Sequence, residues 1–169
     1  MLLAGMLPAG MLMAQAPEAD APATLPGGRV LDTQAAQALW AARKAVFIDV
    51  LPAPPRPAGL PAGTLWQGRQ RRDIPGSAWL PDTGYPTLTP AMAAYFAANL
   101  ARASGGARAA ALVFYCRAHC RHSWQAARRA IALGYTNVAW YPGGTDAWAA
   151  AGLPLEPRTP EPRPAETGH

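Results

Sequence analysis

The chain has 169 residues, of which 50% are apolar and 15% are charged, with 15 Lys and Arg against 10 Asp and Glu. This length fits one globular domain with its own core rather than two domains. The basic residues are spread along the chain without a run that is interleaved with aromatics, so the composition argues against a nucleic-acid-binding protein.

The start of the chain predicts a signal peptide over residues 1–16. An apolar stretch closes on residues 14–16 (Ala-Gln-Ala), the small-x-small form of a secretory cleavage site, although a basic segment before it is missing. A hydrophobic arm of a cytosolic protein is the alternative. The stretch is too short for a good membrane span, so we expect no stable span. We expect a periplasmic protein, in an oxidising compartment where two nearby cysteines can form a disulfide.

Helical and strand patterns begin after a Pro/Ala/Gly-rich segment, 17–28, which predicts a mobile leader. Asp32 and Thr33 predict the start of a helix that runs through residue 40. The apolar run 45–50 predicts a buried parallel strand. The proline-rich residues 51–75 predict a long surface loop. Its arginines are interpreted as a solvated face, or as an anion funnel if the loop folds over the sheet edge; they are Arg69, Arg71 and Arg72.

The second half alternates more regularly and predicts an α/β fold with a mainly parallel sheet flanked by helices. In such sheets, sites lie outside the carboxyl ends of the strands. The domain is expected to cover residues 29–156, and the Pro/Glu-rich residues 157–169 predict a disordered tail. The elements expected in this half are a turn and short strand over 74–80, a helix from 89 to 105, a strand over 109–115, a helix over 123–133, a strand over 137–141 and a helix over 145–151.

Both cysteines of the chain lie in one loop, between the strand 109–115 and the helix that follows it. A thiol at a helix N-terminus among cationic groups is shifted toward the reactive thiolate. Cys116 is therefore the candidate nucleophile, Cys120 the candidate resolving thiol, and Arg121 a candidate catalytic cation. The candidate substrate-binding residues are Arg117, His119, His122 and Asp49.

Three uses of this loop compete. The favoured one is sulfur transfer or thiol exchange, in which Cys116 carries a persulfide taken from a small anionic donor or a protein thiol. The second is soft-metal binding by both cysteines and one histidine. The third is a disulfide that rigidifies a binding module. The favoured reading needs no cofactor and no resident metal. Asp49, at a strand end, is a candidate for orienting a loop or a substrate, but satisfying backbone donors is the commoner role of such an acid.

Several segments in order resemble the rhodanese-like domain family, over roughly residues 30–156. The resemblance implies the α/β fold of that family and a catalytic role for Cys116. The segments that carry it are Val-Phe-Ile-Asp-Val at 46–50, Ile-Pro-Gly-Ser at 74–77, Val-Phe-Tyr-Cys at 113–116, Tyr-Pro-Gly-Gly-Thr-Asp-Ala-Trp at 141–148 and Gly-Leu-Pro-Leu at 152–155.

The cysteine loop departs from the pattern Cys-x-x-Gly-x-Arg-Ser of the family's sulfurtransferases. His119 stands at the glycine position, Arg121 keeps the arginine position, and Ser123 comes one place late, so the loop is expected to be one residue longer. Phosphatases of this fold have an arginine where this chain has His122, which disfavours phosphatase activity.

A narrower group resembles the chain more closely. These are periplasmic rhodanese-like proteins associated with pyrroloquinoline-quinone (PQQ)-dependent alcohol catabolism and named for a paired-cysteine-tryptophan (CXXCW) motif. Here Arg121 replaces the tryptophan after the second cysteine, while Trp124 remains. The resemblance implies an accessory protein of a periplasmic quinoprotein dehydrogenase system. The alternative is a non-catalytic periplasmic protein that handles copper or binds a partner through the loop.

Overall fold

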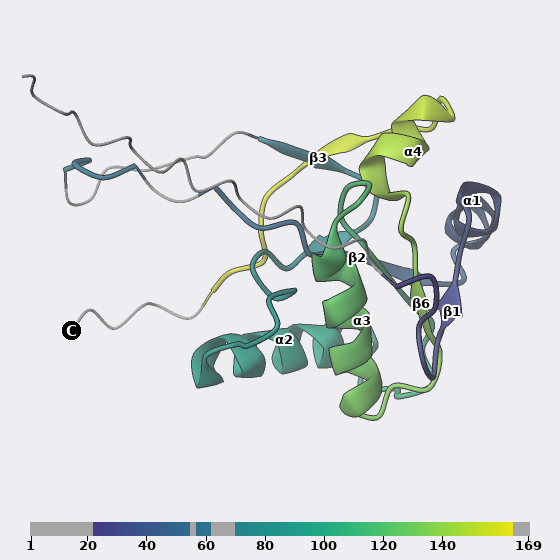
Figure 1. The fold of residues 1–169 in the computed structure, drawn as a ribbon, viewed down its shortest axis with the longest axis horizontal. Coiled ribbons are helices and arrows are strands. Elements are labelled where there is room, and N and C mark those ends of the chain that lie inside the picture. Colours follow the sequence, from purple (N-terminus) through teal and green to yellow (C-terminus); the bar gives the residue numbers. More distant parts are fainter. Residues whose placement is uncertain (1–21, 55–56, 62–69, 164–169) are drawn as a thin grey trace, which may run out of the picture.

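Five parallel strands form the central sheet of the computed structural model, which describes residues 22–54, 57–61 and 70–163 (Figure 1). The predicted signal peptide and Arg69 lie outside the described residues. All neighbouring strands in the sheet run parallel, which confirms the predicted α/β class. Their spatial order is β1 (Arg29–Val30), β6 (Val138–Trp140), β5 (Leu112–Tyr115), β2 (Val46–Asp49) and β4 (Ala78–Trp79).

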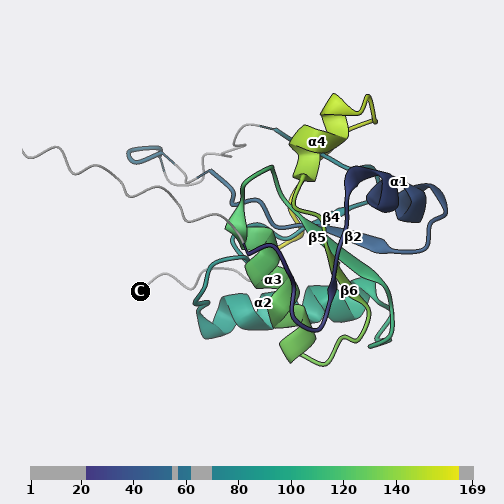
Figure 2. The same ribbon diagram turned by 45° about the vertical axis from the view of Figure 1, so that its right-hand side comes forward.

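Two helices cover each face of this sheet, as Figures 1 and 2 show from two directions. On one face, apolar side chains of α2 (Pro90–Ala103) and α3 (Arg121–Ala132) pack with the strands into the larger core. On the other face, α1 (Thr33–Ala41) and α4 (Gly144–Ala150) enclose a second core that contains Trp148. Because both faces are covered, the middle strands are almost entirely apolar, with Asp49 at the end of β2 as the exception, and β5 is buried at every position.

The predicted helix starts are confirmed where a side chain caps the helix. The Asp32 carboxylate accepts a hydrogen bond from the Ala35 N–H at 2.8 Å, and the Thr89 hydroxyl accepts one from the Met92 N–H at 3.2 Å. Pro90 occupies the first turn of α2, where its missing N–H costs nothing. No helix among the described residues is both long and apolar enough to span a membrane.

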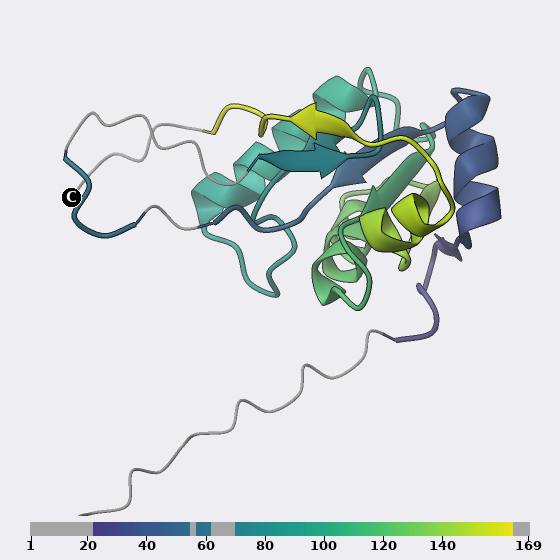
Figure 3. The same ribbon diagram turned by 90° about the horizontal axis from the view of Figure 1, so that it is seen from above.

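A second sheet of two strands differs from the sequence prediction. β3 (Arg71–Asp73) lies inside the predicted loop 51–75 and pairs antiparallel with β7 (Glu156–Arg158), as Figure 3 shows. Beyond β7, the Glu161 N–H donates to the Trp79 carbonyl at 2.9 Å. Part of the predicted tail 157–169 therefore contacts the domain in this structure, and its disorder stays a prediction. Neither β3 nor β7 shows an apolar period in the sequence. Each is held by hydrogen bonds to a partner strand that is distant in the chain, so the sequence pattern does not predict them.

The last part of the predicted leader, residues 22–28, packs against the domain in the structure, and its mobility stays a prediction. Leu25 is only 4% exposed and belongs to the larger core. The Trp124 indole N–H donates to the Thr24 carbonyl at 2.9 Å. One buried leucine and one indole contact hold this segment against α3, and neither produces a periodic pattern in the sequence.

Candidate functional site

The cysteine loop, residues 116–120, joins the carboxyl end of β5 to the start of α3. Cys116 is fully buried directly after β5, and Cys120 is 8% exposed at the N-cap of α3. The two cysteines form a disulfide, with their Cα atoms 6.4 Å apart. The sequence left this pairing open between a resolving thiol and a structural clasp. The structure brings both sulfurs to the sheet edge where sites of parallel sheets lie.

The start of α3 lies at the disulfide, because Cys120 is the N-cap residue of this helix. The Cys120 side chain makes no capping hydrogen bond, and the first turn of α3 holds no acid. The positive end of the helix dipole therefore faces the cysteine loop without a neutralising carboxylate from that turn. The helix begins at Arg121 rather than at Ser123 as predicted. Ser123 Oγ lies 3.5 Å from Cys116 Sγ and receives a hydrogen bond from the Trp140 indole at 3.0 Å. Nothing in the sequence singles out Ser123 beyond its shifted place, because its contact with the Trp140 indole depends on the packing of β6 against α3.

The four predicted cationic residues lie on the loop or on the first turn of α3. Arg117 and His119 are exposed. His119 has a φ of 57°, a left-handed conformation that glycine adopts most easily and that histidine tolerates better than most residues. The buried Nε of Arg121 has no hydrogen-bond partner among the described residues. His122 Nδ1 lies 3.3 Å from Cys120 Sγ.

Hydrogen bonds to residues at the start of α4 hold the backbone of the cysteine loop. Thr145 donates to the Cys116 carbonyl through its N–H at 3.0 Å and its hydroxyl at 3.3 Å. The Ala118 N–H donates to the Asp146 carboxylate at 3.0 Å. Gly144 has a φ of 55°, and a Cβ there would lie 2.6 Å from the Cys116 carbonyl oxygen. The glycine therefore permits a close backbone approach that holds the loop in place.

Asp49 reaches the loop only through Arg71. The Asp49 carboxylate is fully buried and accepts hydrogen bonds from Arg71 Nε at 2.6 Å and from the Leu51 N–H at 2.9 Å. Arg71 Nη2 also donates to the Cys116 carbonyl at 3.2 Å. Burial raises the pKa of Asp49, and the Arg71 guanidinium opposes that rise. These contacts are those of an orienting residue, and a direct role of Asp49 in substrate binding stays a prediction.

Arg71 corrects a sequence interpretation. Its side chain is only 12% exposed, so it does not belong to a solvated face, whereas Arg72 on the same strand is exposed. The two arginines separate because side chains alternate between the two sides of a strand. Only a prediction of strand β3 would have separated the two arginines, and the sequence of β3 has no apolar pattern from which to predict a strand.

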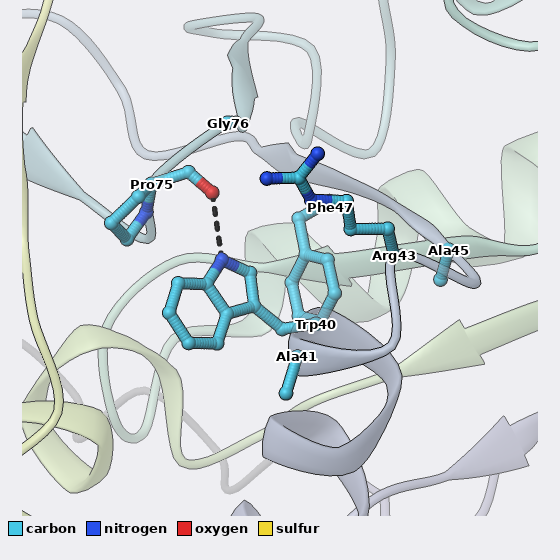
Figure 4. Close-up of a pocket in the computed structure, with 7 residues that line it drawn as sticks. All are labelled: Trp40, Ala41, Arg43, Ala45, Phe47, Pro75 and Gly76. Atoms are coloured by element: carbon cyan, nitrogen blue, oxygen red, sulfur yellow. Dashed lines mark hydrogen bonds between the residues drawn. The ribbon is translucent and has the colours of Figure 1, made fainter.

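A cavity of about 620 Å³ opens on the α1 face of the sheet (Figure 4). The Trp40 indole crosses it and donates to the Pro75 carbonyl at 2.9 Å. The cysteine loop contributes no residue to its wall. The lining residues are Trp40, Ala41, Arg43, Ala45, Phe47, Pro75 and Gly76.

The described part of the chain contains no group of three or more His, Cys, Asp or Glu placed to hold a metal ion. Copper handling stays a prediction that requires the disulfide to be reduced first.

Comparisons with known proteins agree with the fold. The family model of the rhodanese-like domain matches residues 32–151. A thiosulfate sulfurtransferase from Pseudomonas aeruginosa is similar in structure, with a TM-score of 0.52 and 23% identity over 84% of this chain and 22% of that chain. The human single-domain sulfurtransferase TSTD1 is 24% identical, with a TM-score of 0.44, over 72% of this chain and 95% of that chain. No curated protein matches the chain.

Proposed function

Because the chain belongs to the rhodanese-like domain family, we propose that it transfers sulfane sulfur through Cys116 and uses Cys120 to resolve the persulfide. The observation that carries this proposal is the pairing of Cys116 with Cys120 at the carboxyl end of β5. A persulfide carrier needs one nucleophilic thiol, and a second thiol within bonding reach adds a way to discharge it.

The proposed cycle balances without a cofactor. The Cys116 thiolate attacks the outer sulfur of a thiosulfate-type donor, the donor's S–S bond breaks, and sulfite leaves with the electron pair. The Cys120 thiolate then attacks Cys116 Sγ of the persulfide, hydrosulfide leaves, and the Cys116–Cys120 disulfide forms. A dithiol protein or two small thiols reduce that disulfide before the next turnover. The Cys116–Cys120 disulfide supports this resolving step, because it is the bond that the step would form.

An anionic donor suits the cations of the site. Arg121 has a buried Nε without a hydrogen-bond partner among the described residues, and a buried guanidinium donor is costly to leave unsatisfied. An oxyanion of the donor would supply that acceptor. Arg117, which is exposed on the loop, would draw the same anion toward the sulfurs.

The cellular setting is part of the proposal. A loop disulfide is stable in an oxidising compartment such as the periplasm, and the Ala-Gln-Ala segment at 14–16 supports export. The resemblance to the CXXCW group supports an accessory role in PQQ-dependent alcohol oxidation, with a quinoprotein dehydrogenase system as the partner. The protein itself would not need to bind the quinone.

Intact mass spectrometry of two single-cysteine variants tests the function. After reduction and incubation with thiosulfate, Cys120→Ser should gain about 32 Da, the mass of one sulfur, and a thiol reductant should remove it. The gain persists because no resolving thiol remains. Cys116→Ser should gain nothing and should transfer no sulfur.

The wild-type protein provides the matched comparison. It should end about 2 Da below its reduced mass, as a disulfide, and release sulfide. Full turnover by Cys116→Ser would overturn the assignment of the nucleophile. Disulfide formation without any persulfide in Cys120→Ser would leave thiol exchange as the reaction.

A further inference from the structure

The His122 imidazole lies between the disulfide and the loop that follows β4. Its Nδ1 is 3.3 Å from Cys120 Sγ. Its other side meets the Tyr85 ring, with centroids 4.9 Å apart and the planes at 86°. An imidazole nitrogen at this distance from a cysteine sulfur is close enough to exchange a proton with it.

Packing holds the ring in this place. Residues 81–87 form a tight turn-rich loop, and a Cβ on Gly84 would lie 2.4 Å from both the Cβ and the carbonyl oxygen of His122. Arg129, two turns along α3, donates to the carbonyls of Thr83 and Tyr85. The loop is therefore seated on α3 directly over His122, so the ring stays beside Cys120.

We propose that His122 is the acid–base partner of Cys120 and sets its reactivity as the resolving thiol. This rests on the proposed function. In the reduced protein the imidazole takes the Cys120 thiol proton, and the thiolate then attacks Cys116 Sγ of the persulfide. The bond between Cys116 Sγ and the outer sulfur breaks, hydrosulfide leaves with the electron pair, and it takes the proton held by His122. The reaction needs no oxidant, because the sulfane sulfur accepts the electrons.

The imidazole is placed to exchange a proton with Cys120 rather than with Cys116. Cys116 is fully buried, and the Ser123 hydroxyl lies 3.5 Å from its sulfur. A hydroxyl can stabilise a thiolate but does not take up its proton. Cys120 instead has the His122 imidazole 3.3 Å from its sulfur, and an imidazole nitrogen can take up the proton of a thiol. The Tyr85 ring faces this imidazole from the loop and Cys120 Sγ faces it from the N-cap of α3. The same helix also carries Arg121, one residue before His122, and Arg129, two turns after it.

The test measures the reactivity of Cys120 alone, in a Cys116→Ser background. The alkylation rate with iodoacetamide is followed from pH 5 to pH 9, with and without His122→Asn. Loss of the imidazole should move the midpoint of the rate profile up by about one pH unit and slow alkylation at pH 6.5 about tenfold. Gln125→Ala, a change three residues on in the same helix, is the matched control and should keep the parental profile.

A structural role for His122 would give a different result. It would change the thermal midpoint or the near-UV circular dichroism without moving the pH profile, and that outcome would overturn the proposal. His122→Gln provides a second variant if His122→Asn does not fold, and it should show the same upward shift. Alkylation does not depend on sulfur transfer, so a failure of the proposed sulfurtransferase cycle leaves this test intact.

Discussion

Arg71 is the residue that ties the cysteine loop to the buried acid at the end of β2. Its guanidinium bonds to Asp49 on one side and to the Cys116 carbonyl on the other. Asp49 is buried, and a charged group in the protein interior needs a partner. Removing only one member of this pair is therefore expected to lower the free energy of unfolding strongly. The same guanidinium also holds the loop backbone through the Cys116 carbonyl, which links the local stability of the pair to the position of Cys116.

Replacing this arginine should destabilise the fold. Arg71→Met leaves the Asp49 carboxylate buried without its cation, and we expect unfolding free energy to fall by about 3 kcal/mol or more. Urea denaturation measures the change. Arg72→Met, on the neighbouring exposed position of β3, is the control and should cost less than about 1 kcal/mol. Equal effects of the two changes would contradict the placement of Arg71.

At the scale of elements, the pairing of β3 with β7 buries a second carboxylate. Asp73 is fully buried, and its Oδ1 lies 3.4 Å from Arg158 Nε, while its Oδ2 has no hydrogen-bond partner among the described residues. Burial, with a further contribution from the nearby Asp49 charge, raises the pKa of Asp73 to about 7. The weak contact with Arg158 does not offset the loss of solvation.

This carboxyl should make stability depend on pH. Between about pH 4 and pH 7 the folded protein keeps the Asp73 proton while the unfolded chain has lost it, so stability falls as pH rises through that window. The full effect is of order 4 kcal/mol, from the difference between the ordinary aspartate pKa of 3.8 and the raised pKa of about 7.

Thermal or urea unfolding across this pH range measures the effect. Asp73→Asn should flatten the slope, because the amide does not titrate. Glu156→Gln, on the same strand pair with a side chain 43% exposed, should leave the slope close to that of the parent. A slope that survives Asp73→Asn would assign the pH dependence to another group.

At the scale of the whole molecule, the chain after α4 contacts elements that are distant from one another in the sequence. β7 pairs with β3, Glu161 receives a hydrogen bond from the Tyr95 hydroxyl of α2 at 2.9 Å, and Arg163 pairs with Asp82 at 2.5 Å. These contacts bridge the second sheet, α2 and the loop after β4. The segment therefore acts as a strap across the carboxyl-terminal side of β4 and not as a tail.

Removing the strap should weaken the fold that holds the site. A chain that ends at Leu155 loses the Arg158 partner of buried Asp73 as well as the contacts of Glu161, and we expect a loss of about 3 kcal/mol or more. A chain that ends at Arg163 retains every contact named above and is the matched comparison. Equal denaturant midpoints for the two chains would show that the strap contributes no stability.

Local signals in the sequence determined most of the fold and singled out the cysteine loop as the candidate site. Caps at Asp32 and Thr89, apolar runs in the middle strands, and two cysteines beside cationic residues can all be recognised within a few neighbouring positions. The tertiary structure alone decided the rest: the β3–β7 pair, the burial of Arg71, and the contact of His122 with Cys120. The physical reason is that these features depend on partners distant in sequence or on the direction of one side chain, and neither leaves a period in the chain.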